Sequence, residues 1–182
     1  MPITPQQLRN RARNIRLLLL DVDGVLTDGH IIYLPRQGGG MFETKGFHSR
    51  DGLGIRLAHA AGLKTGIITG RSSPVIQYRA KELGIHFVQE EALEKLEPYQ
   101  RILHAAGLSN EQVCYIGDDV VDLPILTRVG LAVAVADGHP LLRRYVHYTT
   151  RRPGGAGAVR ETIELILSAQ KKWNATLAQY LK

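Results

Sequence analysis

Short apolar runs alternate along the chain with longer segments in which apolar residues recur at helical spacing. Runs of the first kind are typical of buried strands, and segments of the second kind are typical of amphipathic helices. The predicted strands are 16–21, 64–69, 85–88, 112–116 and 131–135, and the predicted helices are 4–14, 49–61, 74–83, 93–106, 123–128 and 158–180. Because strands that alternate with helices form βαβ units around a parallel sheet, we expect an α/β protein with a three-layer α/β/α, Rossmann-like sandwich.

A β-hairpin is predicted to interrupt this alternation. Residues 30–34 and 41–47 are short strand-like segments on either side of a loop rich in proline and glycine at 35–40, a pattern that favours a hairpin. This hairpin and one helix occupy the sequence between the first two strands of the sheet, which leaves no room for a separate cap domain. We expect a single domain with two distinct parts: the domain spans 1–182, the hairpin insertion 30–47, and a C-terminal tail and helix 151–182.

The composition narrows the class of protein. The chain has 182 residues, of which 44% are hydrophobic and 22% are charged, so one ordinary core can form. The single cysteine, Cys114, excludes an internal disulfide framework. No apolar run approaches the roughly 20 residues of a membrane span, and the polar segment 1–14 lacks the apolar core of a secretory signal. We expect a soluble, cytoplasmic protein with no membrane partner.

The net charge of +6 indicates anionic partners without saying which kind. Aromatic residues are only 6% of the chain and do not interleave with the arginine clusters. Single-stranded nucleic acid binding requires aromatic stacking platforms beside the charge, so we expect no nucleic acid partner. Nucleic acid binding through the arginine clusters stays a weak alternative, and it would show as salt-sensitive association.

Polar side chains that could take part in catalysis or metal binding follow four of the predicted strands. In chain order they are Asp21, Asp23, Thr69, Arg71, Lys95, Asp118, Asp119 and Asp122. Ligands of an open parallel sheet bind beyond the carboxyl ends of its strands, so these groups are expected to share one crevice. One carboxylate can attack a phosphoryl group while a second protonates the leaving oxygen, and clustered carboxylates favour Mg²⁺. Each motif alone is also typical of an ordinary turn; their joint occurrence indicates phosphoryl transfer.

These motifs resemble the four motifs of the haloacid dehalogenase superfamily of phosphohydrolases. The matching stretches are 21–27, 69–71, Lys95 and 117–122. The resemblance implies that Asp21 is the nucleophile and Asp23 the general acid and base. It also implies that Thr69 binds the transferring phosphoryl group and that Lys95 steadies the charge of the nucleophile and the phosphoryl group.

The same resemblance implies a magnesium site. Mg²⁺ would be held by Asp21, Asp118 and the backbone carbonyl of Asp23. Asp119 and Asp122 would orient the catalytic lysine or a metal-bound water. The expected cofactor is therefore Mg²⁺.

A closer resemblance, over 17–170, is to the 3-deoxy-D-manno-octulosonate 8-phosphate phosphatases. The stretches that carry it are 47–56, 133–140 and 154–161. The resemblance implies a capless homotetramer in which the glycine-rich last stretch reaches toward a neighbouring subunit's active site. It also implies a phosphorylated sugar acid as substrate. The implied substrate-binding residues are Asp23, His48, Ser49, Arg50, Asp51, Gly52, Arg56, Arg71, Arg79 and Lys95.

Two alternatives stay open at this point. Relatives usually carry a glycine and then Asn or Asp ahead of the lysine, where this chain has Glu90-Glu91-Ala92-Leu93-Glu94. This departure bears on substrate choice. The alternative substrate is a nine-carbon sugar-acid 9-phosphate, because the resemblance extends to capless relatives that act on such compounds. A non-catalytic oligomeric partner protein is the alternative of another class, and the intact set of motif residues argues against it.

Overall fold

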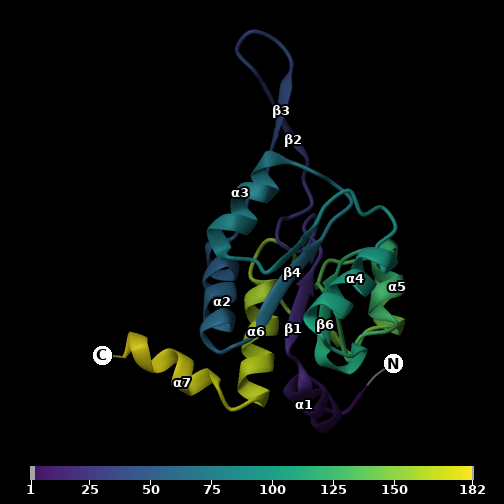
Figure 1. Cartoon of the computed structure of the whole chain (residues 1–182), viewed down its shortest axis with the longest axis vertical. Coiled ribbons are helices and arrows are strands. Elements are labelled where there is room, and N and C mark those ends of the chain that lie inside the picture. Colours follow the sequence, from purple (N-terminus) through teal and green to yellow (C-terminus); the bar gives the residue numbers. More distant parts are fainter. Residues whose placement is uncertain (1–2, 182) are drawn as a thin grey trace.

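The expected parallel sheet is present in the computed structural model, which describes residues 3–181 (Figure 1). Six strands pair in the order β5-β4-β1-β6-β7-β8, and every pairing is parallel. These strands are β1 (Leu17–Leu20), β4 (Lys64–Ile68), β5 (Phe87–Gln89), β6 (Val113–Gly117), β7 (Leu131–Ala134) and β8 (Tyr148–Thr149). The two-residue strand β8 was not predicted, because so short a segment has no periodicity.

Helices cover both faces of this sheet, which confirms the three-layer α/β/α fold. They are α1 (Pro5–Asn14), α2 (Ser49–Ala60), α3 (Pro74–Leu83), α4 (Leu96–Ala106), α5 (Leu123–Leu126), α6 (Ala158–Ala169) and α7 (Trp173–Leu177). Leu18 and Leu20 of β1 share a core with residues of α1, α2, α3 and α6. Leu17 and Leu19 share the opposite core with residues of α4 and α5. A central strand buried on both faces explains the unbroken leucine run of β1.

Local sequence signals explain where several helices begin and end. The Thr4 hydroxyl accepts a hydrogen bond from the backbone N–H of Gln7 and caps α1. Gly84 ends α3 in the left-handed conformation, with φ of 68°. Within residues 3–181, no helix is long and apolar enough to cross a membrane.

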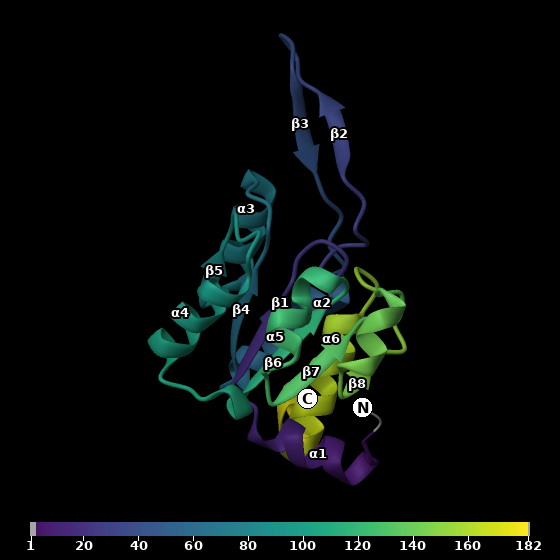
Figure 2. The same ribbon diagram turned by 90° about the vertical axis from the view of Figure 1, so that its right-hand side faces the viewer.

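The predicted hairpin forms a separate two-stranded antiparallel sheet that projects beyond the carboxyl ends of the main sheet (Figure 2). Its strands are β2 (Ile32–Pro35) and β3 (Met41–Thr44), which begin or end within a few residues of the predicted bounds. Both faces of the hairpin expose apolar side chains, among them Tyr33 and Phe42. In the part of the chain that the structure describes, only this hairpin and α2 lie between β1 and β4, and no cap domain is inserted there.

The prediction of one continuous helix over 158–180 is wrong. The chain turns between α6 and α7, where Lys171 has a left-handed backbone with φ of 60°. The turn returns Trp173 to the core, where the guanidinium of Arg160 lies 5.1 Å from the centre of its ring. Packing of this partly buried ring against the core, together with a cation–π contact, helps to offset the cost of the left-handed lysine.

Candidate active site

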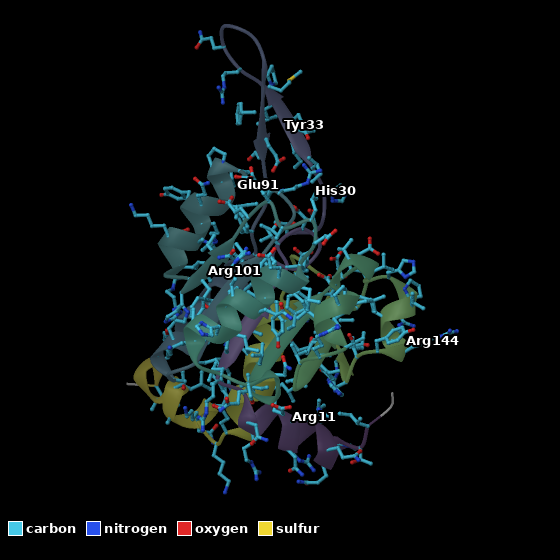
Figure 3. The ribbon with its side chains drawn as sticks, turned by 45° about the vertical axis from the view of Figure 1, so that its right-hand side comes forward. Arg11, His30, Tyr33, Glu91, Arg101 and Arg144 are labelled. Carbon is cyan, nitrogen blue, oxygen red and sulfur yellow. The ribbon has the colours of Figure 1, made fainter. Side chains whose placement is uncertain are left out.

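The predicted motifs converge at the carboxyl ends of four neighbouring strands. Asp21 follows β1, Thr69 follows β4, Asp118 follows β6, and Lys95 precedes α4 in the loop after β5. Figure 3 shows Glu91, from the same loop as Lys95, at the hairpin end of the molecule, and Arg11 at the opposite end. A cavity of about 470 Å³ opens at this edge, lined by Asp21, Asp23, Thr69, Gly70, Arg71, Ala92, Leu93, Lys95 and Val121.

Lys95 is held between two carboxylates at the bottom of this cavity. Its Nζ lies 2.8 Å from Oδ2 of Asp21 and 2.8 Å from Oδ1 of Asp122. The side chain is only 3% exposed. Burial by itself lowers the pKa of Lys95, but the charges of Asp21 and Asp122 outweigh it, so that the pKa lies above its ordinary value. The ammonium is therefore charged wherever the protein is folded and these two carboxylates are ionised.

Asp122 fixes both this lysine and the loop after β6. Its Oδ2 accepts hydrogen bonds from the backbone N–H groups of Asp118, at 2.9 Å, and Asp119, at 3.3 Å. Its Oδ1 accepts one from the Tyr115 hydroxyl, at 2.6 Å. The predicted role of Asp122 in orienting Lys95 agrees with this geometry. The sequence did not single out Tyr115, which reads only as a buried aromatic residue of a central strand.

The carboxylates of Asp21, Asp118 and Asp122 form an acidic cluster that suits a divalent cation. One oxygen of each lies within 4.8 Å of the others. Burial raises the pKa of Asp21 to about 6, and burial together with the charges of Asp21 and Asp122 raises the pKa of Asp118 to about 7. A Cβ at Gly24 would overlap the Asp118 carboxylate, so this glycine leaves the space in which the carboxylate lies. Carboxylate oxygens are ligands that Mg²⁺ prefers, and a bound cation would offset the cost of ionising these neighbouring carboxyl groups together.

Asp23 is in contact with the hairpin. Lys45, which follows β3, donates a hydrogen bond from Nζ to Oδ1 of Asp23 at 2.5 Å. The same ammonium pairs with Oε1 of Glu43 at 3.0 Å, and Nε of Arg71 lies 3.8 Å from Oδ2 of Asp23. Sequence reasoning missed Glu43 and Lys45. Their signal was a pair of opposite charges two positions apart, on one face of a predicted strand.

The other predicted substrate-binding residues lie apart from the catalytic cavity. Ser49, Arg56 and Arg79 line a second cavity of about 500 Å³, together with Phe47, Val75, Tyr78 and Glu82. Arg50 lines a third cavity of about 580 Å³, which also contains Arg151, Arg152 and Arg160. His48 caps α2 by accepting a hydrogen bond from the backbone N–H of Arg50. The cavities that they line are not the one that contains Asp21.

Asp51 and Gly52 are buried in the packing of helices. The Asp51 carboxylate accepts hydrogen bonds from the backbone N–H groups of Gly157, at 3.1 Å, and Arg160, at 2.7 Å, at the start of α6. Burial raises the pKa of Asp51. A Cβ at Gly52 would overlap the guanidinium of Arg79. Both contacts join packed elements of this chain, and substrate binding by these residues stays a prediction.

The chain is similar to known proteins over nearly its whole length. Residues 53–130 match the haloacid dehalogenase-like hydrolase family. The 3-deoxy-D-manno-octulosonate 8-phosphate phosphatase KdsC of Yersinia pestis is 49% identical over 89% of this chain and 84% of that protein. KdsC of Escherichia coli K12 is 45% identical over 93% of this chain and 88% of that protein.

The chain also has the same fold as a solved structure. The phosphatase from Moraxella catarrhalis, in complex with a magnesium ion, a phosphate ion and KDO, has a TM-score of 0.91 at 38% identity. The match covers 97% of this chain and 99% of that one. The chain therefore belongs to the haloacid dehalogenase-like hydrolases and, among them, to the KdsC family of 3-deoxy-D-manno-octulosonate 8-phosphate phosphatases.

Proposed function

We propose that the chain is a Mg²⁺-dependent phosphatase that converts 3-deoxy-D-manno-octulosonate 8-phosphate to the free sugar acid and phosphate, as a step of lipopolysaccharide biosynthesis. The observation that carries this proposal is the contact between Asp21 and Lys95 in a cavity that Asp23 and Thr69 also line. The substrate follows from the names of the relatives, which match this chain at 43% to 49% identity.

In the first step, a carboxylate oxygen of Asp21 attacks phosphorus. The bond from phosphorus to the sugar oxygen breaks as the new bond forms, and Asp23 gives its proton to the departing sugar oxygen. Thr69 and Lys95 contact the transferring phosphoryl group. Because the Lys95 ammonium already lies 2.8 Å from Asp21, its positive charge is in place before the phosphoryl charge shifts.

In the second step, water cleaves the aspartyl-phosphate. Asp23, now ionised, takes a proton from the attacking water, whose oxygen bonds to phosphorus while the bond to Asp21 breaks. Phosphate leaves, and both carboxyl groups return to their starting states. The rigid support of Lys95 by Asp122 keeps the site in the same geometry for both steps.

Asp21, Asp118 and the backbone carbonyl of Asp23 would hold Mg²⁺. When bound, the cation supplies positive charge that screens the carboxylates from each other and from the phosphoryl oxygens. Asp122 is not among these ligands, because its two oxygens already accept hydrogen bonds from Lys95, Tyr115 and the loop backbone. Asp21 and Asp118 are then the two carboxylates of the cluster that would bind the cation.

The assembly that we propose is a homotetramer in the cytoplasm. The projecting hairpin exposes apolar side chains on both faces, and such a ribbon is suited to pairing with a second copy. The cavities that contain Arg50 and Arg56 lie outside the catalytic cavity of their own subunit. A neighbouring subunit would bring such arginines to the sugar acid and would also exclude water from the site.

The test is phosphate release from a panel of sugar phosphates, with Mg²⁺ or with a chelator, by the wild type and by Asp21→Asn. The proposal expects Mg²⁺-dependent release that is greatest for the eight-carbon acid and is lost in the variant. A preference for a nine-carbon acid would replace the substrate and keep the reaction. No release from any phosphate by the folded, Mg²⁺-loaded protein would refute the enzymatic proposal.

A further inference from the structure

The side chain of Lys45 is fully buried, although the residue lies at the base of a solvent-exposed hairpin. Its side chain is 0% exposed, whereas the side chains of Asp23, Glu43 and Arg71 around it are 22%, 16% and 45% exposed. A lysine is almost never fully buried unless it is paired, because removing an ammonium from water costs several kcal/mol. The contacts of Lys45 therefore indicate what this burial serves.

Those contacts form a closed ring of alternating charge. The Lys45 ammonium contacts Oδ1 of Asp23 at 2.5 Å and Oε1 of Glu43 at 3.0 Å. Arg71 completes the ring, with Nη1 3.3 Å from Oε2 of Glu43 and Nε 3.8 Å from Oδ2 of Asp23. Each acid meets both bases and each base meets both acids. The hairpin contributes Glu43 and Lys45, while Asp23 and Arg71 follow strands of the main sheet.

The ring treats the two oxygens of Asp23 differently. Oδ1 accepts a short hydrogen bond from a buried ammonium, and Oδ2 has only the longer contact with the half-exposed Arg71. Oδ2 is therefore the oxygen of Asp23 that is left to contact a substrate. Proton transfer requires the acid to lie within hydrogen-bond reach of the leaving oxygen, so the orientation of Asp23 decides its efficiency.

We propose that Lys45 and Glu43 are positioning residues for Asp23: Lys45 holds Oδ1 so that Oδ2 faces the substrate, and Glu43 holds Lys45 and Arg71 in place. This inference rests on the proposed function, in which Asp23 protonates the leaving sugar oxygen. It assigns the base of the hairpin to leaving-group protonation, in addition to any role of the hairpin's apolar faces in assembly.

The test compares two leaving groups in the full-length protein. An alkyl phosphate needs a proton on its departing oxygen, whereas p-nitrophenyl phosphate releases a stable anion that needs none. We measure kcat/KM, which reports the steps up to release of the leaving group, for Lys45→Met, Glu43→Gln and the matched control Lys64→Met. Lys64 is an exposed lysine at the amino end of β4, opposite the end that Arg71 follows. The alkyl phosphate is the sugar phosphate that the wild type hydrolyses fastest.

For Lys45→Met the inference expects kcat/KM to fall about 100-fold on the alkyl phosphate and less than about 5-fold on p-nitrophenyl phosphate. Glu43→Gln shows the same selectivity with a smaller loss, and Lys64→Met shows neither. Equal losses of kcat/KM on both substrates would mean that Lys45 and Glu43 have only a structural role, and would overturn the inference. If Lys45→Met does not fold, Glu43→Gln decides, because it keeps the shape of the side chain.

The design separates this inference from the proposed function. A wild type that prefers an alkyl phosphate other than the eight-carbon acid overturns the proposed substrate, and the selective loss is then measured on the preferred compound. A wild type that hydrolyses the eight-carbon acid, with variants that lose both activities equally, leaves the proposed function standing and overturns the role of Lys45 and Glu43.

Discussion

At the scale of single residues, Glu91 has a backbone conformation that favours glycine. Its φ is 56°, in the loop that leads from β5 to Lys95. Left-handed backbone costs a residue with a Cβ roughly 1–2 kcal/mol. We expect Glu91→Gly to raise the free energy of unfolding by about 1 kcal/mol, since glycine gives back part of this gain as chain entropy.

Chemical denaturation in the presence of Mg²⁺ measures the effect of Glu91→Gly. The matched control is Glu94→Gly, which removes the same charge from the same loop at a residue whose φ is not positive. The control is expected to be neutral or destabilising. An equal gain in both variants would mean that loss of negative charge, and not relief of the backbone, is the cause.

The acidic cluster makes stability depend on pH and Mg²⁺ together. In the metal-free protein the pKa of Asp21 is raised from 3.8 to about 6 and that of Asp118 from 3.8 to about 7, in each case mainly by burial. The native state therefore binds these protons more tightly than the unfolded state does. Their contribution to stability is fully present below the unfolded pKa and is lost as the pH rises through about 6 and 7.

Mg²⁺ replaces these protons, so its stabilising effect is expected to grow with pH. The measurement is the rise in Tm on adding Mg²⁺, which we expect to be larger at about pH 8 than at about pH 5. Asp118→Asn should remove most of the rise at both pH values. A rise in Tm that does not depend on pH would show that the cation binds elsewhere than at this carboxylate cluster.

At the scale of elements, the start of α6 is capped by a residue of α2, a helix that is distant in sequence. The Asp51 carboxylate accepts two backbone hydrogen bonds at the start of α6 while it is itself in the first turn of α2. Removing a buried capping carboxylate leaves both N–H groups without an acceptor. We expect Asp51→Ala to lower the free energy of unfolding by about 2 kcal/mol.

Asp51→Asn keeps one acceptor oxygen and should lose less. Urea denaturation measures both variants, and kcat/KM is measured on the folded protein. Loss of activity in Asp51→Asn at unchanged stability would support the predicted substrate-binding role of Asp51. Equal stability of Asp51→Ala and the wild type would contradict its role as a cap.

The sequence predicts elements and motifs well wherever the signal is local. Asp21, Thr69 and Asp118 directly follow apolar strands. Because ligands of a parallel sheet bind beyond the carboxyl ends of its strands, these residues could be predicted to share one site. The course of the hairpin is not local information, so the contact of Lys45 with Asp23 was missed. The cap from Asp51 to α6 joins residues 106 positions apart and was missed for the same reason. Lys171 takes a conformation in which a glycine would have been the signal.

At the scale of the whole molecule, the hairpin is the feature that a monomer does not explain. The side chain of Phe42 is 39% exposed on one face of the hairpin, and that of Tyr33 is 57% exposed on the other. If the hairpin joins subunits, Phe42→Glu places a charge in an interface. We expect the variant to form smaller assemblies than the wild type and to lose activity with the sugar acid.

Val88→Glu is the matched control for this variant. Val88 is 38% exposed on the edge strand β5, so the same change in charge is made at nearly the same exposure. Sedimentation velocity gives the assembly state of each protein. A wild type that is monomeric and fully active would contradict the proposed tetramer.

The reaction that we propose requires Asp21 to become covalently phosphorylated. The most direct measurement is acid quenching of the Mg²⁺-loaded enzyme during turnover of 3-deoxy-D-manno-octulosonate 8-phosphate, followed by mass spectrometry of the peptide that contains Asp21. We predict that this peptide carries one phosphoryl group in the wild type and none in Asp21→Asn, which also releases no phosphate. Phosphate release by Asp21→Asn at the wild-type rate would show that hydrolysis does not pass through a phosphorylated Asp21.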